Sequence, residues 1–514
     1  MQQVSNEWKS AHEQLLVPES YVELRLTVSD PDALADASAS SNGEEAFSNA
    51  PSIVKDTEKS PTRFATLEKN IWALDGSFSI LPDTPEPEKE GYIGPVLSGD
   101  DGTFDTPPKL IMSFSQVFTP IIPGITILWA TAYNEWADTF TVTAYNGSAI
   151  VAHTEVSGNR SLESVVSLDI QDYDRIEVSV LKWCLPSRRA RVQRLAIGIE
   201  KVYGKSELLN FSHSMSVDPL SAVLPKSEIT FEIVNLNGEY NPDNPSGAEK
   251  YLMERQRITA RYGYRLNGSV EWIPAGTFYM SEWETPQNGI SATFTARDVL
   301  EYMSDPYSGQ TTGTLMDIAI SALEQADLPS LSSKIPKWVV DESLSGLAPA
   351  VNADLSGNSI MEVLQYVANA ACCVFFQDRN GTVHIEPLPA GETDYRIGPF
   401  VSYANSEISL TKQLKAIDVN SGQYVLSVGI VGETQKLDNP LISDERAPSV
   451  ANWAADVLRN RKLLSGNFRA DPRLDALDRV TNENQFAETV VLVTEVSYTY
   501  NGAFRGAYEG RAGV

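Results

Sequence analysis

Short runs in which apolar and polar residues alternate occupy most of the chain, and turn-forming dipeptides separate them. In the run VPESYVELRLTV, every second residue from 22 to 28 is apolar, which predicts a half-buried strand. Asn-Gly dipeptides begin at residues 42, 146, 237, 267, 288, 380 and 501, and most of them separate two alternating runs. Because Asn-Gly favours the tight turns of β-hairpins, we expect a mainly β protein.

Helical periodicity is confined to a few segments. Apolar residues recur at helical spacing over residues 315–323 and again over residues 360–371, where Ser359 or Asn358 is the expected N-cap. A third apolar stripe predicts a helix over about residues 448–462. The expected fold class is therefore α+β with strands in the majority.

Changes in this pattern divide the chain into regions. The region 29–63 is rich in Ala, Ser, Asn, Asp and Glu, has no periodicity and is predicted to be an exposed linker loop. The region 64–205 contains short strands with regular turns, which is typical of a β-sandwich of jelly-roll type. The full division is 1–28 with 206–302 (a first small β-barrel), 29–63 (linker), 64–205 (an inserted sandwich), 303–392 (an α+β module) and 393–514 (a second small β-barrel).

The order of these stretches resembles the hub proteins at the tail tips and baseplates of tailed bacteriophages. The family's first barrel is similar to the stretch LPKSEITFEIVNLNGEYNP followed by RITARYGYRLNGSVEWIPAGTFYMSEW. The family's helical module is similar to IMEVLQYVANAACCVFFQDRNGTVHIEPL. The family's second barrel is similar to RADPRLDALDRV followed by VTEVSYTYNGAFRGAYEGR. The chain departs from the family pattern through its inserted sandwich, which resembles a carbohydrate-binding jelly roll. It also departs because no peptidase or lysin sequence follows the second barrel.

The resemblance implies a virion structural protein with no enzymatic activity of its own. A hub of this family is a homotrimer that forms part of the DNA channel and joins the tail tube to the host-recognition components. It would contact the ring of distal tail or tube proteins and the tape-measure protein, and it would be assembled in the host cytoplasm. The inserted sandwich would contact host cell-surface glycans. The alternative is a carbohydrate-binding adhesin or accessory module that acts through residues 64–205.

The acidic composition argues against nucleic-acid recognition. The 514 residues include 68 acidic and 40 basic side chains, so the net charge is −28 and the surface repels phosphates. The longest apolar run, VANAACCVFF, is too short to span a bilayer. Three cysteines, two of them adjacent, do not form a disulfide framework. We therefore expect no sequence-specific nucleic-acid binding, no membrane-spanning segment and synthesis in a reducing compartment.

The sequence contains no motif that predicts catalysis, a metal or a cofactor. A GxSxG nucleophile elbow and a phosphate-binding GxxxxGK[ST] loop are both missing, and the four histidines form no ligand-spaced pair. Acidic residues cluster at 100–105 and 471–478 without the spacing of a calcium loop, and we interpret them as solvated carboxylates. We therefore predict no catalytic residues, no metal ligands and no cofactor-binding residues.

A candidate glycan contact lies in the predicted sandwich. Tyr133, Asn134 and Trp136 fall in one loop between two strands. Aromatic rings offer flat apolar faces for sugars, and amides can bind sugar hydroxyls. The alternative is that Trp136 packs inside the sandwich, as we expect for Trp129.

Two charged clusters are candidates for interfaces. Arg469, Asp471, Arg473 and Asp475 alternate in sign, which predicts an ion-pair network that stabilises a turn or joins two subunits. Basic residues are also dense over 182–194. In a chain of such acidity, these predict a charged strand edge or a docking surface for an acidic neighbour.

Overall fold

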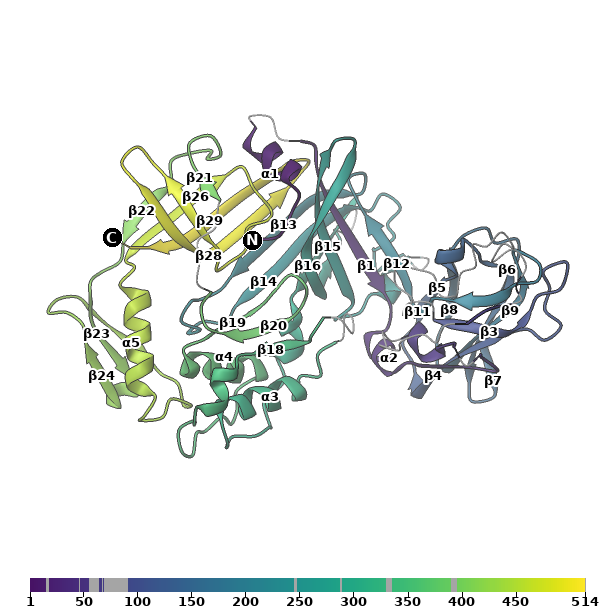
Figure 1. Ribbon diagram of the computed structural model, residues 1–514, viewed down its shortest axis with the longest axis horizontal. Helices are drawn as coiled ribbons and strands as arrows, with labels where there is room; N and C mark the ends of the chain where they lie inside the picture. The colour runs from purple at the N-terminus through teal and green to yellow at the C-terminus, as the bar shows by residue number, and fades with distance from the viewer. Residues whose placement is uncertain are drawn as a thin grey trace.

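The structure is a computed structural model, and it describes residues 1–14, 18–45, 47–54, 64–66, 68, 91–244, 247–286, 289–329, 335–389 and 395–513. Figure 1 shows a large sheet in the middle of the molecule, helices below it, and a separate β-sandwich at the far end. Strands predominate over helices, as the alternating pattern predicted.

Strands from both ends of the chain form the large sheet, which is antiparallel except for the parallel pair β21–β27. Its order is β12-β1-β15-β16-β17-β14-β13-β28-β29-β26-β22, and β27 and β21 extend it from β28. The bounds, in sheet order, are β12 Ile199–Tyr203, β1 Ser20–Val28, β15 Arg257–Leu266, β16 Ser269–Glu284, β17 Ser291–Arg297, β14 Lys226–Val234, β13 Leu208–Ser216, β28 Glu488–Tyr500, β29 Phe504–Ala512, β26 Lys462–Phe468 and β22 Glu407–Leu410, followed by β27 Arg479–Glu483 and β21 Arg396–Ile397.

The two strand sets that were predicted as separate barrels are joined edge to edge. Strand β13 pairs with β28, with His213 opposite Tyr498. One continuous core lies against this sheet and contains Phe231 and Tyr262 from the first set together with Tyr498 from the second. An unpaired edge strand exposes a row of backbone donors and acceptors, and this pairing satisfies both rows at once.

Tight turns connect the longest strands of each set. Asn267 and Gly268 join β15 to β16, and both have positive φ angles, 48° and 91°. This conformation is costly for most side chains but accessible to Asn and Gly. Asn501 and Gly502 lie in the turn between β28 and β29. The dipeptides therefore mark the hairpins as the sequence predicted.

The sandwich packs a five-stranded sheet, β2-β4-β9-β6-β7, against smaller sheets β11-β5-β8 and β10-β3. Trp129, Phe140 and Trp183 are buried between them. Trp129 is thus a core residue, as expected. The bounds are β2 Ser38–Ser41, β3 Tyr92–Leu97, β4 Lys109–Phe118, β5 Ile122–Leu128, β6 Ala137–Asn146, β7 Ala149–Val156, β8 Glu163–Ile170, β9 Tyr173–Trp183, β10 Arg189–Val192 and β11 Arg194–Ile197.

The prediction that residues 29–63 form an exposed linker is wrong for the part that the structure describes. Asp30 caps the short helix α2 (Pro31–Asp36), β2 adds an edge strand to the sandwich, and η1 (Ala50–Ile53) buries Ile53 in its core. Strand β2 has the sequence SASS, so it carries no apolar residue larger than alanine. The alternation that reveals the other strands is consequently missing from this one.

The helical module centres on α3 (Leu315–Gln325) and α4 (Ile360–Ala371), which pack against each other. Both helices begin with a reciprocal capping box, and the N-cap of α4 is Ser359, one of the two predicted candidates. A small sheet, β18-β20-β19, completes the module, with β18 Trp338–Val340, β19 Val374–Gln377 and β20 Val383–Glu386.

The third helix belongs to this module and not to the second barrel. Helix α5 (Ala447–Leu458) buries Ala451 and Ala454 in the same core as α3 and α4. The sheet β24-β23-β25 joins that core as well, with β23 Leu414–Val419, β24 Tyr424–Ser427 and β25 Glu433–Leu437. Helix α5 ends at residue 458, short of the predicted 462, because β26 begins at Lys462.

Candidate functional site

The predicted glycan loop places its three residues in different environments. Tyr133 ends the turn η3 (Thr131–Tyr133), Asn134 is exposed with a φ of 54°, and Trp136 is half-buried against the sandwich core. The guanidinium of Arg191 lies 4.4 Å from the centre of the Tyr133 ring, so one face of that ring is already covered. Asn134 is the most accessible of the three, and glycan binding by this loop stays a prediction.

A buried ion-pair network lies beneath this loop. Arg191 donates two hydrogen bonds of 2.6 Å to Glu68, and Arg188 lies 2.7 Å from Glu135. Trp183 also donates to Glu135, at 2.8 Å. Burial raises the pKa of Glu135, and it would raise the pKa of Glu68 too, but the hydrogen bonds from Arg191 lower it. Arg188 and Arg191 are therefore internal, and the prediction that the whole basic cluster forms a charged edge or docking surface is wrong for these two.

The alternating charges at residues 469–475 lie in the loop between β26 and β27. Asp471 is fully buried and accepts hydrogen bonds from the Arg473 Nε at 2.9 and 2.8 Å. Burial would raise the pKa of Asp471, but His12 and Arg473 lower it. Arg469 donates to the backbone oxygen of His12 in helix α1 (Asn6–Glu13). The interpretation of this acidic cluster as solvated is therefore wrong for Asp471.

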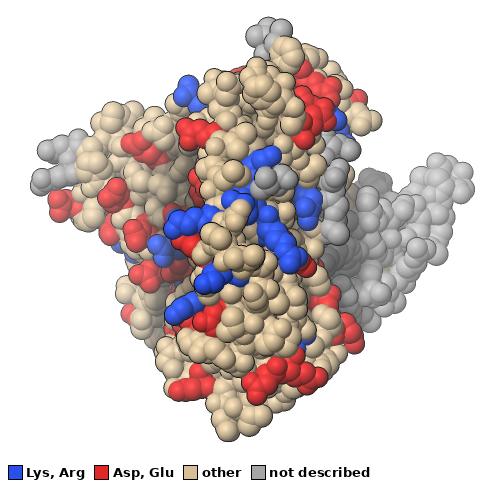
Figure 2. All heavy atoms as spheres, turned by 90° about the vertical axis from the view of Figure 1, so that its left-hand side faces the viewer, with Lys and Arg blue, Asp and Glu red and all other residues tan. Residues whose placement is uncertain are grey.

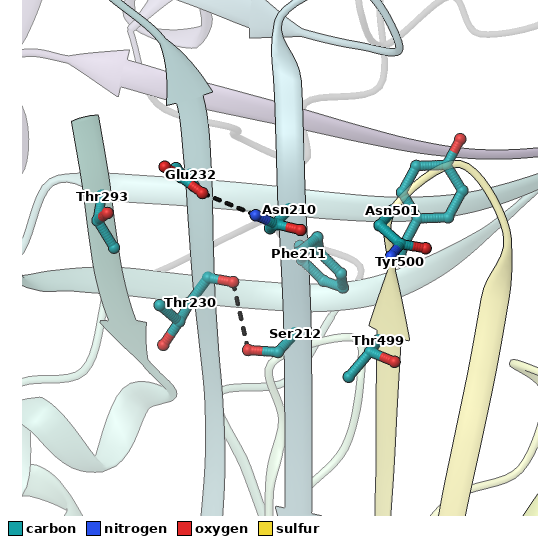
Figure 3. A pocket seen from close by; sticks show the side chains of 9 residues that line it. All are labelled: Asn210, Phe211, Ser212, Thr230, Glu232, Thr293, Thr499, Tyr500 and Asn501. Atoms are coloured by element: carbon teal, nitrogen blue, oxygen red, sulfur yellow. Dashed lines mark hydrogen bonds between the residues drawn. The ribbon is translucent and has the colours of Figure 1, made fainter. Parts of the chain in front are cut away.

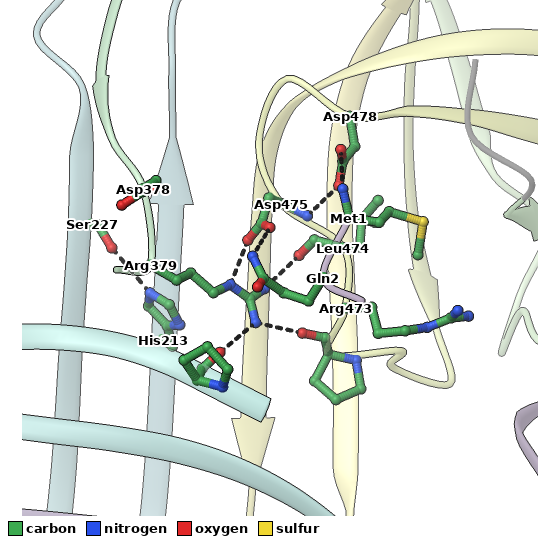
Figure 4. A network of polar contacts seen from close by, with 12 residues as sticks. Met1, Gln2, His213, Ser227, Asp378, Arg379, Arg473, Leu474, Asp475 and Asp478 are labelled. Carbon is green, nitrogen blue, oxygen red and sulfur yellow. Dashed lines mark hydrogen bonds and ion pairs between the residues drawn. The ribbon is translucent and has the colours of Figure 1, made fainter. Parts of the chain in front are cut away.

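Asp475 is held by a residue from the helical module. Arg379, in the β19–β20 turn, donates from Nε to Asp475 at 2.5 Å (Figure 4). Its other nitrogens donate to the carbonyls of Pro472, Leu474 and Pro274 at 2.7, 2.9 and 3.0 Å. Arg379 thereby ties the module to both strand sets of the large sheet. Sequence reasoning missed it, and the only local signal was an arginine inside an otherwise ordinary DRNG turn.

The chain's first residues complete this network. The amino group of Met1 lies 2.6 Å from Asp478, and Gln2 donates to Asp475 at 2.8 Å. Loop 471–478 is consequently fixed by residues from the N-terminal segment, the module and the second strand set (Figure 4). These contacts join three parts of the chain that are distant in sequence, so we interpret loop 471–478 as a structural joint.

A shallow pocket of about 290 Å³ lies on the outward face of the large sheet, where β17, β14, β13 and β28 run side by side (Figure 3). Asn210 donates to Glu232 at 2.7 Å, and the Ser212 hydroxyl donates to the Thr230 carbonyl at 3.4 Å. Most of the lining residues carry a hydroxyl or an amide, but they lie beside the rings of Phe211 and Tyr500 and the carboxylate of Glu232. The lining residues are Asn210, Phe211, Ser212, Thr230, Glu232, Thr293, Thr499, Tyr500 and Asn501.

Within the described parts of the chain, no three His, Cys, Asp or Glu side chains are grouped so as to hold a metal ion. None of the helices described is both long enough and apolar enough to cross a membrane.

Comparison with solved structures retrieves phage tail proteins. The 43 kDa tail protein of prophage MuSo2 from Shewanella oneidensis is 13% identical, with a TM-score of 0.42 over 60% of this chain and 94% of its own. The tail protein from Neisseria meningitidis MC58 is 10% identical, with a TM-score of 0.43 over 61% of this chain and 93% of its own. Both retrieved structures are described as tail proteins, the class of protein that the sequence resembles.

A carbohydrate-binding structure is also retrieved. The family 32 carbohydrate-binding module of C. perfringens NanJ, in complex with galactose, is 14% identical, with a TM-score of 0.21 over 34% of this chain and 99% of its own. No protein-family model matches the sequence. No curated protein matches it significantly either. At these identities and TM-scores, the similarities do not by themselves assign a function to the chain.

Proposed function

We propose that the chain is a structural subunit of a phage tail tip, in which three copies form a hub. The observation that carries this proposal is the single sheet formed by two strand sets from opposite ends of the chain. Each set contains a long hairpin with an Asn-Gly turn, β15–β16 in one and β28–β29 in the other. One copy would therefore contribute two comparable segments, side by side, to the wall of a central channel.

Three such copies would present six wall segments around an axis. That number matches a sixfold tube above the hub, and closed rotational symmetry is the usual arrangement of homo-oligomers. The outward face around Ser212 and Thr230 carries hydroxyl and amide side chains together with the carboxylate of Glu232, which suits a wall that faces water and passing DNA. The hub would contact the ring of distal tail or tube proteins and the tape-measure protein, and it would act without catalysis.

The inserted sandwich is the proposed host-contacting part. It has its own core and stands apart from the large sheet in Figure 1. Lys250 and Asp169, 2.8 Å apart, form an exposed ion pair between the sandwich and the main body. In this arrangement the sandwich is free to meet a cell-surface glycan or a neighbouring tail protein.

The mass of the full chain in solution tests the hub. Light scattering after size exclusion should give about three times the 56.4 kDa mass of one chain, and electron microscopy of the particles should show threefold symmetry around a central opening. Particles of one or two copies at micromolar concentration would contradict the proposal.

The second candidate is an adhesin that acts through residues 64–205, and the independent core of the sandwich favours it. Its test is a glycan array probed with the full chain and with an Asn134→Ala, Trp136→Ala variant. A matched control carries Asn146→Ala, at the exposed end of β6 beside the turn to β7. Binding that is lost only in the loop variant, from a protein that is monomeric, would favour the adhesin over the hub.

A further inference from the structure

One side of the molecule carries a band of basic side chains despite the net charge of −28 (Figure 2). Lys412 follows strand β22, Lys415 lies in β23, and both are exposed. Lys412 also forms an exposed ion pair with Glu433 of the same chain. Arg461 lies beside them, because its guanidinium donates to the Thr411 carbonyl at 2.8 and 3.0 Å. Lys462 is the direct strand partner of Leu410. A compact basic surface on so acidic a chain suits an acidic neighbour.

The same surface exposes apolar side chains at the end of the large sheet. All four residues of β22 are exposed, including Ile408 and Leu410. Ile408 lies directly opposite Leu464, which is buried, so the core face of the sheet continues onto β22 without a cover. The outer edge of β22 has no strand partner among the described residues. Such an edge is a template for contact with another chain.

A loop tip extends this apolar surface. Ile430 is 95% exposed and Val431 is also exposed. Val428 N donates to the Lys415 carbonyl at 2.9 Å, and Glu433 N donates to the Gln413 carbonyl at 2.8 Å, so the tip lies beside the lysines. We name this surface the basic patch: Ile408, Leu410, Lys412, Lys415, Ile430 and Val431.

A second surface combines exposed apolar residues with the opposite charge. Leu236 is 74% exposed and Ile290 is also exposed, and the Asn235 N donates to the Ile290 carbonyl at 2.6 Å, which places the two side by side. Glu282 and Glu284 are exposed on the neighbouring strand β16, paired with β17. We name this surface the acidic patch: Leu236, Glu282, Glu284 and Ile290.

We propose that the basic patch of one copy docks on the acidic patch of the next copy. The two patches are different surfaces of one chain, so the contact is heterologous and repeats head to tail until a ring closes. Opposite charges set the orientation, and the apolar residues of both patches leave water together. The inference rests on the proposed trimer and names the surfaces that would form it.

A charge-exchange experiment on the full chain tests this contact. Light scattering should give three copies for the wild type and one copy for the double variant Lys412→Glu, Lys415→Glu. Adding Glu282→Lys and Glu284→Lys to that variant should restore three copies, since the attraction is re-established with its sign reversed. The matched control is Lys9→Glu with Lys205→Glu, two exposed lysines outside both patches, and it should remain trimeric.

A second variant guards against a folding defect. Ile430→Ser with Val431→Ser alters only an exposed loop tip, so the melting temperature should stay within about 2 °C of the wild type while the trimer is lost. A trimeric wild type whose patch variants also remain trimeric would overturn this inference and leave the proposed hub standing. A wild type that is not trimeric would overturn both.

Discussion

The joint around Arg379 allows a quantitative test of how the module is attached to the large sheet. We consider Arg379→Met, which keeps the length of the stem but removes the charge and four hydrogen bonds. Breaking a buried ion pair by removing one partner costs about 3–5 kcal/mol. Asp475 retains some contact with water and keeps its bond to Gln2, so we expect a loss near the lower end, about 3 kcal/mol.

The assay combines urea unfolding with hydrogen exchange measured by mass spectrometry. Far-ultraviolet circular dichroism gives the unfolding free energy of the variant and the wild type. In the variant, amide exchange should become faster in residues 374–386 and 471–478, which the joint connects. Exchange in the sandwich should stay the same. The control is Arg459→Met, which removes an exposed pair with Asp456 and should cost less than about 0.5 kcal/mol.

A double variant separates the ion pair from the three carbonyl contacts. Arg379→Met with Asp475→Asn leaves no unpaired carboxylate, so it should be about 1 kcal/mol more stable than Arg379→Met alone. A loss below about 1 kcal/mol for Arg379→Met, or exchange that increases equally across the whole chain, would refute the idea that this joint holds the module.

Three further predictions concern single side chains. Burial raises the pKa of Asp298 to about 7, so the folded chain binds this proton more tightly and loses stability as the pH rises from about 4 to 7. The unfolding free energy of Asp298→Asn, measured with urea, should therefore rise by about 4 kcal/mol relative to that of the wild type between pH 4 and pH 8. Burial lowers the pKa of His213 well below its usual value, so stability should fall as the pH drops below 6.5. His213→Gln should flatten that part of the profile, and an unchanged slope would contradict the assignment. Ser359→Ala removes the N-cap of α4 and should cost about 1 kcal/mol in thermal unfolding, whereas Ser345→Ala, in an exposed turn, should cost almost nothing.

Local features of this fold could be predicted from the sequence, because neighbouring residues decide them. The turn at Asn501-Gly502 depends on two residues that tolerate positive φ angles. Helix α4 depends on an apolar stripe and on Ser359 with Glu362, three residues apart. Each of these signals lies within a dozen residues of chain.

The remaining features depend on partners that are distant in sequence. Nothing in the composition of β13 reveals that β28, more than 270 residues away, will complete its edge. Arg379 looks like any turn arginine until Asp475 is placed beside it. Helix α5 has an apolar stripe that predicts burial, but the stripe does not say which core receives it. The candidate loop at Tyr133 was found from its composition, whereas the cover that Arg191 provides required coordinates in space.

The attachment of the sandwich has a consequence for the history of such chains. Strands β1 and β12 are adjacent and antiparallel, and Val28 lies opposite Ile199. The polypeptide thus leaves the large sheet and returns to it at neighbouring points, with about 170 residues in between. A shorter loop or an unrelated domain could replace those residues while every strand of the sheet kept its place. The junction between β1 and β12 is therefore a place where a different inserted domain would leave the strand order of the large sheet unchanged.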